Sequence, residues 1–304
     1  MSVSEDGAAI VASDLRKTYG EVEVVRGIDL RVQRGEVFAL LGPNGAGKTT
    51  VIEILEGHRR RTSGEVRALG RDPEHLDRET RTRIGIVFQT AGLEPYLTVA
   101  ETVDLHRGYY PSPRPRDEVL ELVGLHEETG KDVARLSSGQ RRRLDLALAL
   151  AGDPELLFLD EATTGFDPAA RRDAWEIIRT LAGLGKTVFL TTNSMDEAQV
   201  LADHLAVLNH GEIVAEGVPP KPEDRDAGPT RIRFRVQDTS GMPVLGFDPT
   251  SDGMLEISTD EPAWVLHELT AWALANRRQL DGLEVRRPTL EDMYLELIRG
   301  EEEA

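Results

Sequence analysis

The stretch GPNGAGKTT, residues 42–50, has the residue types and the spacing of a loop that binds phosphate. Its three glycines allow the backbone to curl so that N–H groups face phosphate oxygens, and a helix that begins there adds a positive dipole. We expect Lys48 to contact the β- and γ-phosphates and the hydroxyl of Thr49 to ligate Mg²⁺. A plain glycine-rich turn is the alternative, but it does not explain the strand before the loop and the helix after it. The stretch predicts a nucleoside triphosphate site formed by Gly42, Pro43, Asn44, Gly45, Ala46, Gly47, Lys48, Thr49 and Thr50.

Two adjacent carboxylates end a later apolar run, LLFLDE, at Asp160 and Glu161. A carboxylate at the end of a buried strand beside a phosphate loop can hold Mg²⁺ through water, which suits Asp160. Glu161 is then left to orient the attacking water. The alternative is that both residues cap the helix that begins near Pro168.

The segments around these residues predict an α/β fold. Short continuous apolar runs alternate with helical patterns in the first half of the chain, and such runs are typical of strands buried on both faces. The strand-like runs are EVFALL (36–41), RIGIVF (83–88), ELLFLD (155–160) and TVFLTT (187–192). Between residues 89 and 150 helical patterns replace them. We therefore expect a mainly parallel sheet with a helical insertion at about residues 90–150.

A second unit is expected after a linker. The segment VPPKPEDRDAGP, residues 218–229, combines proline, glycine and charge, which is typical of a linker. Before it, residues 1–217 form the first domain. Residues 230–304 contain the strand-like RIRFRV and MLEIS, and helical patterns in PAWVLHELTAWALANRR and TLEDMYLELIRG. This length suffices for a small α+β unit.

Composition excludes several kinds of function. The net charge is −18, which would repel a phosphate backbone over most of the surface, so no nucleic acid partner is expected. The chain has no cysteine, which excludes disulfides and thiol nucleophiles. Its 7 histidines have no metal-ligand spacing. No apolar run reaches the ~18 residues that span a bilayer, so we expect the chain to stay in the cytoplasm.

The segment RLSSGQRRRLDLALALAGDP lies between the two phosphate-site motifs, and here the chain resembles the ATP-binding cassette (ABC) family. The family signature LSGGQ corresponds to LSSGQ at 136–140. The resemblance implies a P-loop NTPase cassette that binds ATP and Mg²⁺ and dimerises around two ATP molecules, with the signature of one subunit completing the site of the other. By this resemblance the residues that act in trans are Ser137, Ser138, Gly139 and Gln140.

The resemblance also assigns three further positions. Gln89 is the Q-loop residue near Mg²⁺ and the water, so that Thr49, Gln89 and Asp160 are the expected metal ligands. Tyr19 stacks on adenine, and Asp167 is the D-loop residue that links the two sites. Alternatively, Tyr19 is an aromatic residue at a strand edge and Gln89 a strand cap.

Three positions depart from the family pattern. Asn193, at the end of VFLTTN, stands where the family has its switch histidine, so the resemblance implies a slower catalytic site formed by Glu161, Asn193 and Gln89. A simple cap at the end of the strand is the alternative for Asn193. Ser138 replaces a signature glycine, and Ala162 stands where proline usually follows the glutamate.

Among ABC proteins, TTGFDP, TTNSMDEAQ and RRPTLEDMYLELI resemble most the ATPase subunits of daunorubicin-type drug-resistance exporters. This resemblance implies an ATPase that works with a separate transmembrane permease, as a homodimer on the inner face of the cell membrane. We expect residues 90–110 to contact the permease and residues 230–304 to regulate or dimerise. The alternatives are a cassette ATPase that acts on nucleic acid or ribosomes, and a slow nucleotide-gated switch.

Overall fold

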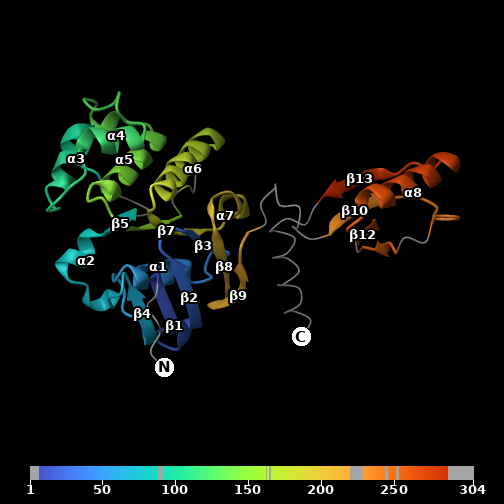
Figure 1. The fold of residues 1–304 in the computed structure, drawn as a ribbon, viewed down its shortest axis with the longest axis horizontal. Helices are drawn as coiled ribbons and strands as arrows, with labels where there is room; N and C mark the ends of the chain where they lie inside the picture. Colours follow the sequence, from blue (N-terminus) through green and yellow to red (C-terminus); the bar gives the residue numbers. More distant parts are fainter. Residues whose placement is uncertain are drawn as a thin grey trace. The chain divides into compact units, whose positions relative to one another are not determined.

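The computed structural model describes residues 7–87, 92–161, 163, 166–219, 229–243, 246–250 and 253–286. The chain folds as two units, Met1–Pro219 and Pro220–Ala304 (Figure 1). Each unit has its own hydrophobic core.

A six-stranded sheet forms the centre of the first unit, in the order β5-β6-β7-β3-β8-β9. Five strands are parallel and the edge strand β9 is antiparallel to β8. The inner strands are mostly apolar and almost all of their residues are buried, as a parallel sheet covered on both faces requires. The strands are β3 (Val37–Leu41), β5 (Ile84–Val87), β6 (Leu156–Asp160), β7 (Thr187–Thr192), β8 (His204–Asn209) and β9 (Glu212–Gly217). The mainly parallel α/β fold is therefore confirmed.

A second, antiparallel sheet in this unit was not predicted from the sequence. It consists of β1 (Ala8–Tyr19), β2 (Val22–Gln33) and β4 (Ser63–Ala68) in the order β2-β1-β4. Helix α1 (Lys48–Leu55) shares one apolar core with this sheet and with β3. The core thus fixes the helix that follows residues 42–47.

The helices of the insertion gather at one end of the first unit (Figure 1). They are α3 (Val99–Arg107), α4 (Arg116–Leu122) and α5 (Ser138–Leu150), and the described residues 92–150 contain no strand. Three further helices complete the unit: α2 (Arg78–Thr82), α6 (Pro168–Gly183) and α7 (Met195–Leu201). Helices α6 and α7 pack against β7, the strand that ends just before Asn193.

The second unit is a small sheet with one helix packed on it. Its strands are β10 (Thr230–Arg235), β11 (Asp248–Pro249), β12 (Leu255–Thr259) and β13 (Asp281–Arg286), in the order β11-β12-β10-β13. Helix α8 (Pro262–Ala275) buries Leu269 and Trp272 against Ile232 and Phe234 of β10. The helix expected in TLEDMYLELIRG lies outside the described residues.

None of the helices in the described part of the chain is long and apolar enough to cross a membrane.

Candidate functional site

The loop of residues 42–47 joins β3 to α1, as its motif requires. Gly45 and Gly47 have φ angles of 83° and 110°, which other L-residues rarely adopt. Gly42 serves a different purpose from the predicted curl, because a Cβ there would lie 2.3 Å from the carbonyl oxygen of Leu208. The loop therefore needs glycine both for its turns and for its close approach to β8.

Lys48 is the only buried lysine among the described residues, with 4% of its surface exposed. Its Nζ donates to the carbonyl oxygens of Gly42 at 2.9 Å and Pro43 at 3.1 Å. The same Nζ lies 3.5 Å from Oε1 of Glu161. The ammonium group is thus held inside the loop, beside the second of the two carboxylates.

The first turn of α1 has no side-chain cap. Its N-cap is Gly47, whereas the N-caps of α3, α6 and α7 are Thr98, Asp167 and Ser194, whose side chains accept hydrogen bonds from the first turn. Uncapped N–H groups together with a helix dipole favour an anion. The start of α1 therefore has the donor set that phosphate oxygens need.

Asp160 and Glu161 are both tied to Thr191 of the neighbouring strand β7. The Thr191 hydroxyl donates to Oδ1 of Asp160 at 2.5 Å, and its oxygen accepts from the backbone N–H of Glu161 at 3.1 Å. The Glu161 N–H also lies 3.2 Å from the Thr191 carbonyl oxygen, and Glu161 has a left-handed φ of 46°. This backbone geometry turns the glutamate towards Lys48.

Burial raises the pKa of Asp160, and the charge of Glu161 raises it further. The hydrogen bond from Thr191 and the charge of Lys48 act in the opposite direction. Among the described residues no group of three or more His, Cys, Asp or Glu could hold a metal by itself. A metal at Asp160 therefore needs further oxygens, such as phosphate and the Thr49 hydroxyl.

Asn193 lies against the phosphate-binding loop. Its Nδ2 is 3.3 Å from Oδ1 of Asn44, and the loop is also joined to this strand end by the N–H of Gly42 and the carbonyl oxygen of Thr192, at 3.2 Å. The N-cap of α7 is Ser194, which accepts from the N–H of Glu197. Asn193 is therefore not the cap of the helix that follows it.

Asp167 is the N-cap of α6, where one carboxylate oxygen accepts from Ala169 N at 2.9 Å and Ala170 N at 3.0 Å. The alternative that Asp160 and Glu161 cap this helix is therefore wrong. The segment is also tied to α7, because the buried Glu197 carboxylate accepts from the Thr163 hydroxyl at 2.6 Å and from Trp175 Nε1 at 3.0 Å.

The signature residues begin α5 with a reciprocal cap. Ser137 Oγ accepts from Gln140 N at 3.2 Å, and Gln140 Oε1 accepts from Ser137 N at 3.1 Å. The Gln140 amide also donates to Glu128 at 2.7 Å and accepts from Lys131 at 3.1 Å. Ser138 is exposed, and Gly139 has room for a Cβ at ordinary contact with Ala170.

Three positions named from the sequence remain: Tyr19, Gln89 and Ala162. Tyr19 ends β1, its ring centroid lies 4.8 Å from Lys17 Nζ and 5.4 Å from the Arg59 guanidinium, and the residue is 39% exposed. Gln89 and Ala162 lie outside the described residues.

Sequence reasoning missed Thr191 and Glu197. Thr191 stands two residues before Asn193, and a threonine in a strand is also favoured for its β-branched shape. Glu197 lies at the start of a helix, where acidic residues are common, so it did not stand out either. Only their positions could have indicated a role, since the two residues lie on either side of Asn193 at the end of its strand.

Comparison with known proteins decides the family. Residues 25–164 match the model of the ABC transporter family. The chain is 34% identical over 302 residues to the daunorubicin resistance ATP-binding protein DrrA3 of Streptomyces coeruleorubidus, covering 95% of each chain. It is 39% identical to the Nod factor export ATP-binding protein I of Rhizobium etli, covering 97% of this chain and 95% of that protein. The chain belongs to the ABC transporter family.

Solved structures agree with this assignment. The dimeric cassette MJ0796, in a post-hydrolysis state with ADP and Pi, is 28% identical, with a TM-score of 0.61, and the match covers 69% of this chain and 98% of that one. Residues 230–289 match the family model of an ABC transporter domain-containing protein-like C-terminal domain. The protein is an ABC ATPase of the export type, and the comparisons support this interpretation over a cassette that acts on nucleic acid or ribosomes.

Proposed function

We propose that this ABC ATPase hydrolyses ATP at the site between residues 42–50, 160–161 and 193 and thereby drives a separate permease that exports a cargo. The observation that carries the proposal is the convergence of three strand ends. Lys48 after β3, Glu161 after β6 and Asn193 after β7 meet around one glycine-rich loop. Ligands of open α/β sheets bind at this edge of the sheet.

The loop is proposed to hold the triphosphate. Backbone N–H groups of residues 42–50 and the start of α1 receive phosphate oxygens, and Lys48 exchanges its two carbonyl acceptors for the β- and γ-phosphates. Asn44 is the residue of this loop that contacts Asn193. The Tyr19 ring, with two cations beside it, is the proposed platform for adenine.

Mg²⁺ fits the remaining donors. Thr49 Oγ1, Asp160 and Gln89 are the proposed ligands, and all offer the oxygen that Mg²⁺ prefers. Oδ1 of Asp160 is used by Thr191, while Oδ2 accepts no hydrogen bond from the part of the chain that the structure describes. Bound there, Mg²⁺ would neutralise charge on the phosphates.

Glu161 is the proposed general base. Its carboxylate lies beside Lys48, so a triphosphate that attracts the lysine also releases the carboxylate to accept a proton from the attacking water. Asn193 would donate one hydrogen bond to the γ-phosphate or to the water, but an amide cannot pass on a proton. We therefore expect turnover that is slow but real.

The complete site is proposed to need two copies of the chain. Ser137, Ser138, Gly139 and Gln140 begin α5, and the start of this helix would receive the γ-phosphate held by the other copy. The dimeric cassette structure supports this arrangement. Asp167, at the start of α6, is proposed to join the two sites.

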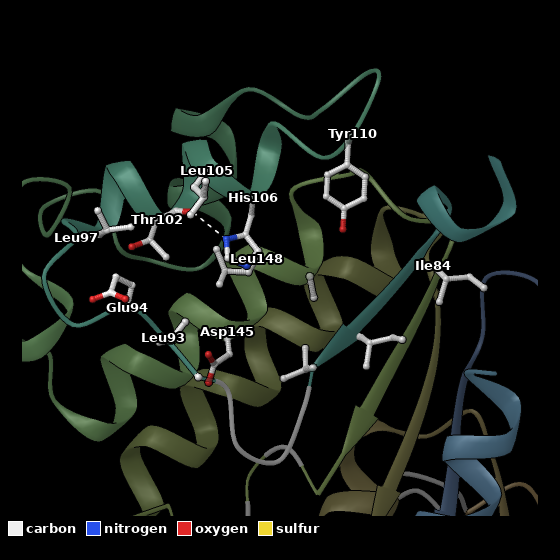
Figure 2. A pocket seen from close by; sticks show the side chains of 14 residues that line it. Ile84, Leu93, Glu94, Leu97, Thr102, Leu105, His106, Tyr110, Asp145 and Leu148 are labelled. Carbon is white, nitrogen blue, oxygen red and sulfur yellow. Dashed lines mark hydrogen bonds between the residues drawn. The ribbon is translucent and has the colours of Figure 1, made fainter. Parts of the chain in front are cut away.

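The permease is proposed to dock in a groove of the helical insertion. A cavity of about 450 Å³ is lined mostly by apolar side chains of β5, α3, α5 and the segment 92–97 (Figure 2). The exposed Leu105 contributes to its rim. Val87, the last residue of β5, lines the groove two positions before Gln89 in the chain, so docking would be sensitive to the nucleotide site. In such a complex the chain lies on the inner face of the cell membrane, and residues 230–304 regulate or dimerise.

The function is tested with Glu161→Gln. The variant should bind ATP with wild-type affinity, hydrolyse it roughly 10²–10⁴-fold more slowly because it lacks the base, and form a more persistent dimer with ATP. Phosphate release and size-exclusion chromatography with ATP are the measurements. Turnover at the wild-type rate would show that Glu161 is not the base.

A further inference from the structure

The groove of the insertion contains a buried carboxylate that the ATP site does not use. Asp145, on α5, lines the cavity together with Leu93 and Leu148 (Figure 2). Only 10% of its side chain is exposed. A charge among apolar side chains is costly unless it is paired, so its presence here needs a physical reason.

Asp145 is only partly satisfied by its own chain. Oδ2 lies 3.7 Å from Nη1 of Arg142, one turn earlier on the same helix. Oδ1 is fully buried and accepts no hydrogen bond from any described residue. An unpaired buried oxygen of this kind destabilises the protein, and a ligand that donates a hydrogen bond to it would remove that loss.

Arg142 compensates the charge of Asp145 only in part. The two groups are 3.7 Å apart, and the charge of Asp160 also acts on the Arg142 guanidinium. Burial raises the pKa of Asp145 to about 6 despite the nearby arginine. At neutral pH the Asp145 carboxylate is therefore largely ionised and incompletely compensated.

The other described residues that line the cavity supply no cation. They include no lysine or arginine, and Glu94 adds a second, exposed carboxylate. His106 has Nδ1 3.0 Å from the carbonyl oxygen of Thr102, a contact drawn in Figure 2. The groove is thus apolar with a negative charge inside, and its complement is an apolar segment with one positive charge.

We propose that Asp145 determines the specificity of this groove by accepting hydrogen bonds from one lysine or arginine of an otherwise apolar docking segment of the permease. The inference rests on the proposed function, because it names the chemistry of the partner that the groove takes. A basic side chain that enters the cavity would donate to Oδ1 once the side chains that cover this oxygen move aside, and Arg142 would stay on Oδ2. A segment with a neutral or acidic residue at this place would leave the carboxylate unpaired, which gives discrimination.

The experiment uses the full-length chain and a display library of random 16-residue peptides. Peptides selected on the wild type are synthesised, and their dissociation constants are measured by fluorescence anisotropy. Loss of binding to Leu105→Glu identifies those that occupy the groove, because Leu105 is half-exposed and lines it. Asp145→Asn removes the charge but keeps the shape, Asp145→Glu keeps the charge, and Glu94→Gln is the control for an exposed carboxylate in the same cavity. Circular dichroism establishes that each variant is folded.

Groove-binding peptides should carry a lysine or arginine among apolar residues. Changing that residue to norleucine, or Asp145 to Asn, should weaken binding at least tenfold, and the two changes together should cost little more than either alone. Asp145→Glu should retain most of the binding, and Glu94→Gln should change it by less than about threefold. Groove-binding peptides that lack a basic residue would overturn the inference. Peptides whose dissociation constants are unchanged by Asp145→Asn would overturn it as well, because water alone would then satisfy the carboxylate.

ATP turnover of the same preparation separates this inference from the proposed function. Normal turnover without any preference for a basic residue would overturn the role of Asp145 alone. A clear preference without turnover would contradict the ATPase activity and leave the preference of the groove standing.

Discussion

Two helices of the cassette begin where the sequence predicts a phosphate, and their first turns are built differently. At α1 the N-cap is Gly47 and no side chain bonds the first turn. At α5 Ser137 and Gln140 cap each other's backbone, and Gln140 also bonds Glu128 and Lys131. The first helix leaves its N–H donors available to a ligand, whereas the second helix bonds its N-terminal N–H groups with its own side chains.

The difference separates what one chain provides from what needs a partner. The start of α1 and its lysine are organised within a single chain, so nucleotide binding should not require a dimer. At the start of α5 a phosphate has to compete with the capping side chains for the N–H groups. We infer that only a second copy of the chain with bound nucleotide positions a phosphate there. Changes at α1 should therefore weaken ATP binding, and changes at α5 should affect turnover.

The largest effect is expected for Lys48→Ala. Removing the only full positive charge of the loop should weaken ATP binding by about 2–3 kcal/mol, roughly 30- to 150-fold, since hydrogen bonds from a charged donor are lost. Isothermal titration calorimetry measures the affinity. Lys48→Met, which keeps the apolar stem in its buried place, is the matched control and should lose a similar amount. Unchanged affinity in both variants would remove Lys48 from the phosphate site.

A smaller effect is expected for Asn193→His, on turnover rather than on binding. A histidine reaches farther and can pass a proton, so steady-state turnover should rise several-fold with similar ATP affinity. Loss of one preorganised donor typically costs ~10²–10³ in rate, and a bridging water limits that loss in the wild type. If the histidine variant is no faster, Asn193→Ala decides whether the asparagine contributes at all: a large loss of turnover means that it does.

The smallest effect is expected for Gln140→Ala at α5. Loss of the reciprocal cap should lower the free energy of unfolding by about 1 kcal/mol, as measured by urea denaturation. ATP affinity should stay at the wild-type value, because α1 is unchanged. A large fall in affinity would contradict the separation of the two helices.

The sequence predicted the parallel sheet better than the antiparallel one. Strands such as VFALL are buried on both faces and give continuous apolar runs. Strands β1 and β2 pair with register shifts at several places, including between Ala12 and Leu15 and between Lys17 and Thr18. Each shift interrupts the period of two, so an alternating pattern is lost from the sequence although the strands are long.

Within the site, the sequence motifs predicted which residues bind the nucleotide, but not the neighbouring residues that hold them in place. Gly45 and Gly47 have the positive φ angles that the motif predicts, whereas the reason for Gly42 is its distance from β8. Thr191 and Asp145 have ordinary places in a strand and a helix. Their roles depend on which side chains tertiary packing brings beside them, and one-dimensional spacing does not contain that information.

Mixing two inactive variants tests the central claim, that each ATP site combines the P-loop of one copy with the signature of another. Lys48→Ala removes the lysine at α1, and Ser138→Glu places a negative charge at the exposed start of α5, where helix formation tolerates it. Each variant alone should be nearly inactive, but a mixed dimer pairs the intact loop of one copy with the intact signature of the other. Phosphate release by an equimolar mixture should therefore recover to a sizeable fraction of the wild-type rate. A mixture that is as inactive as its components, although both variants fold and exchange subunits, would contradict the account.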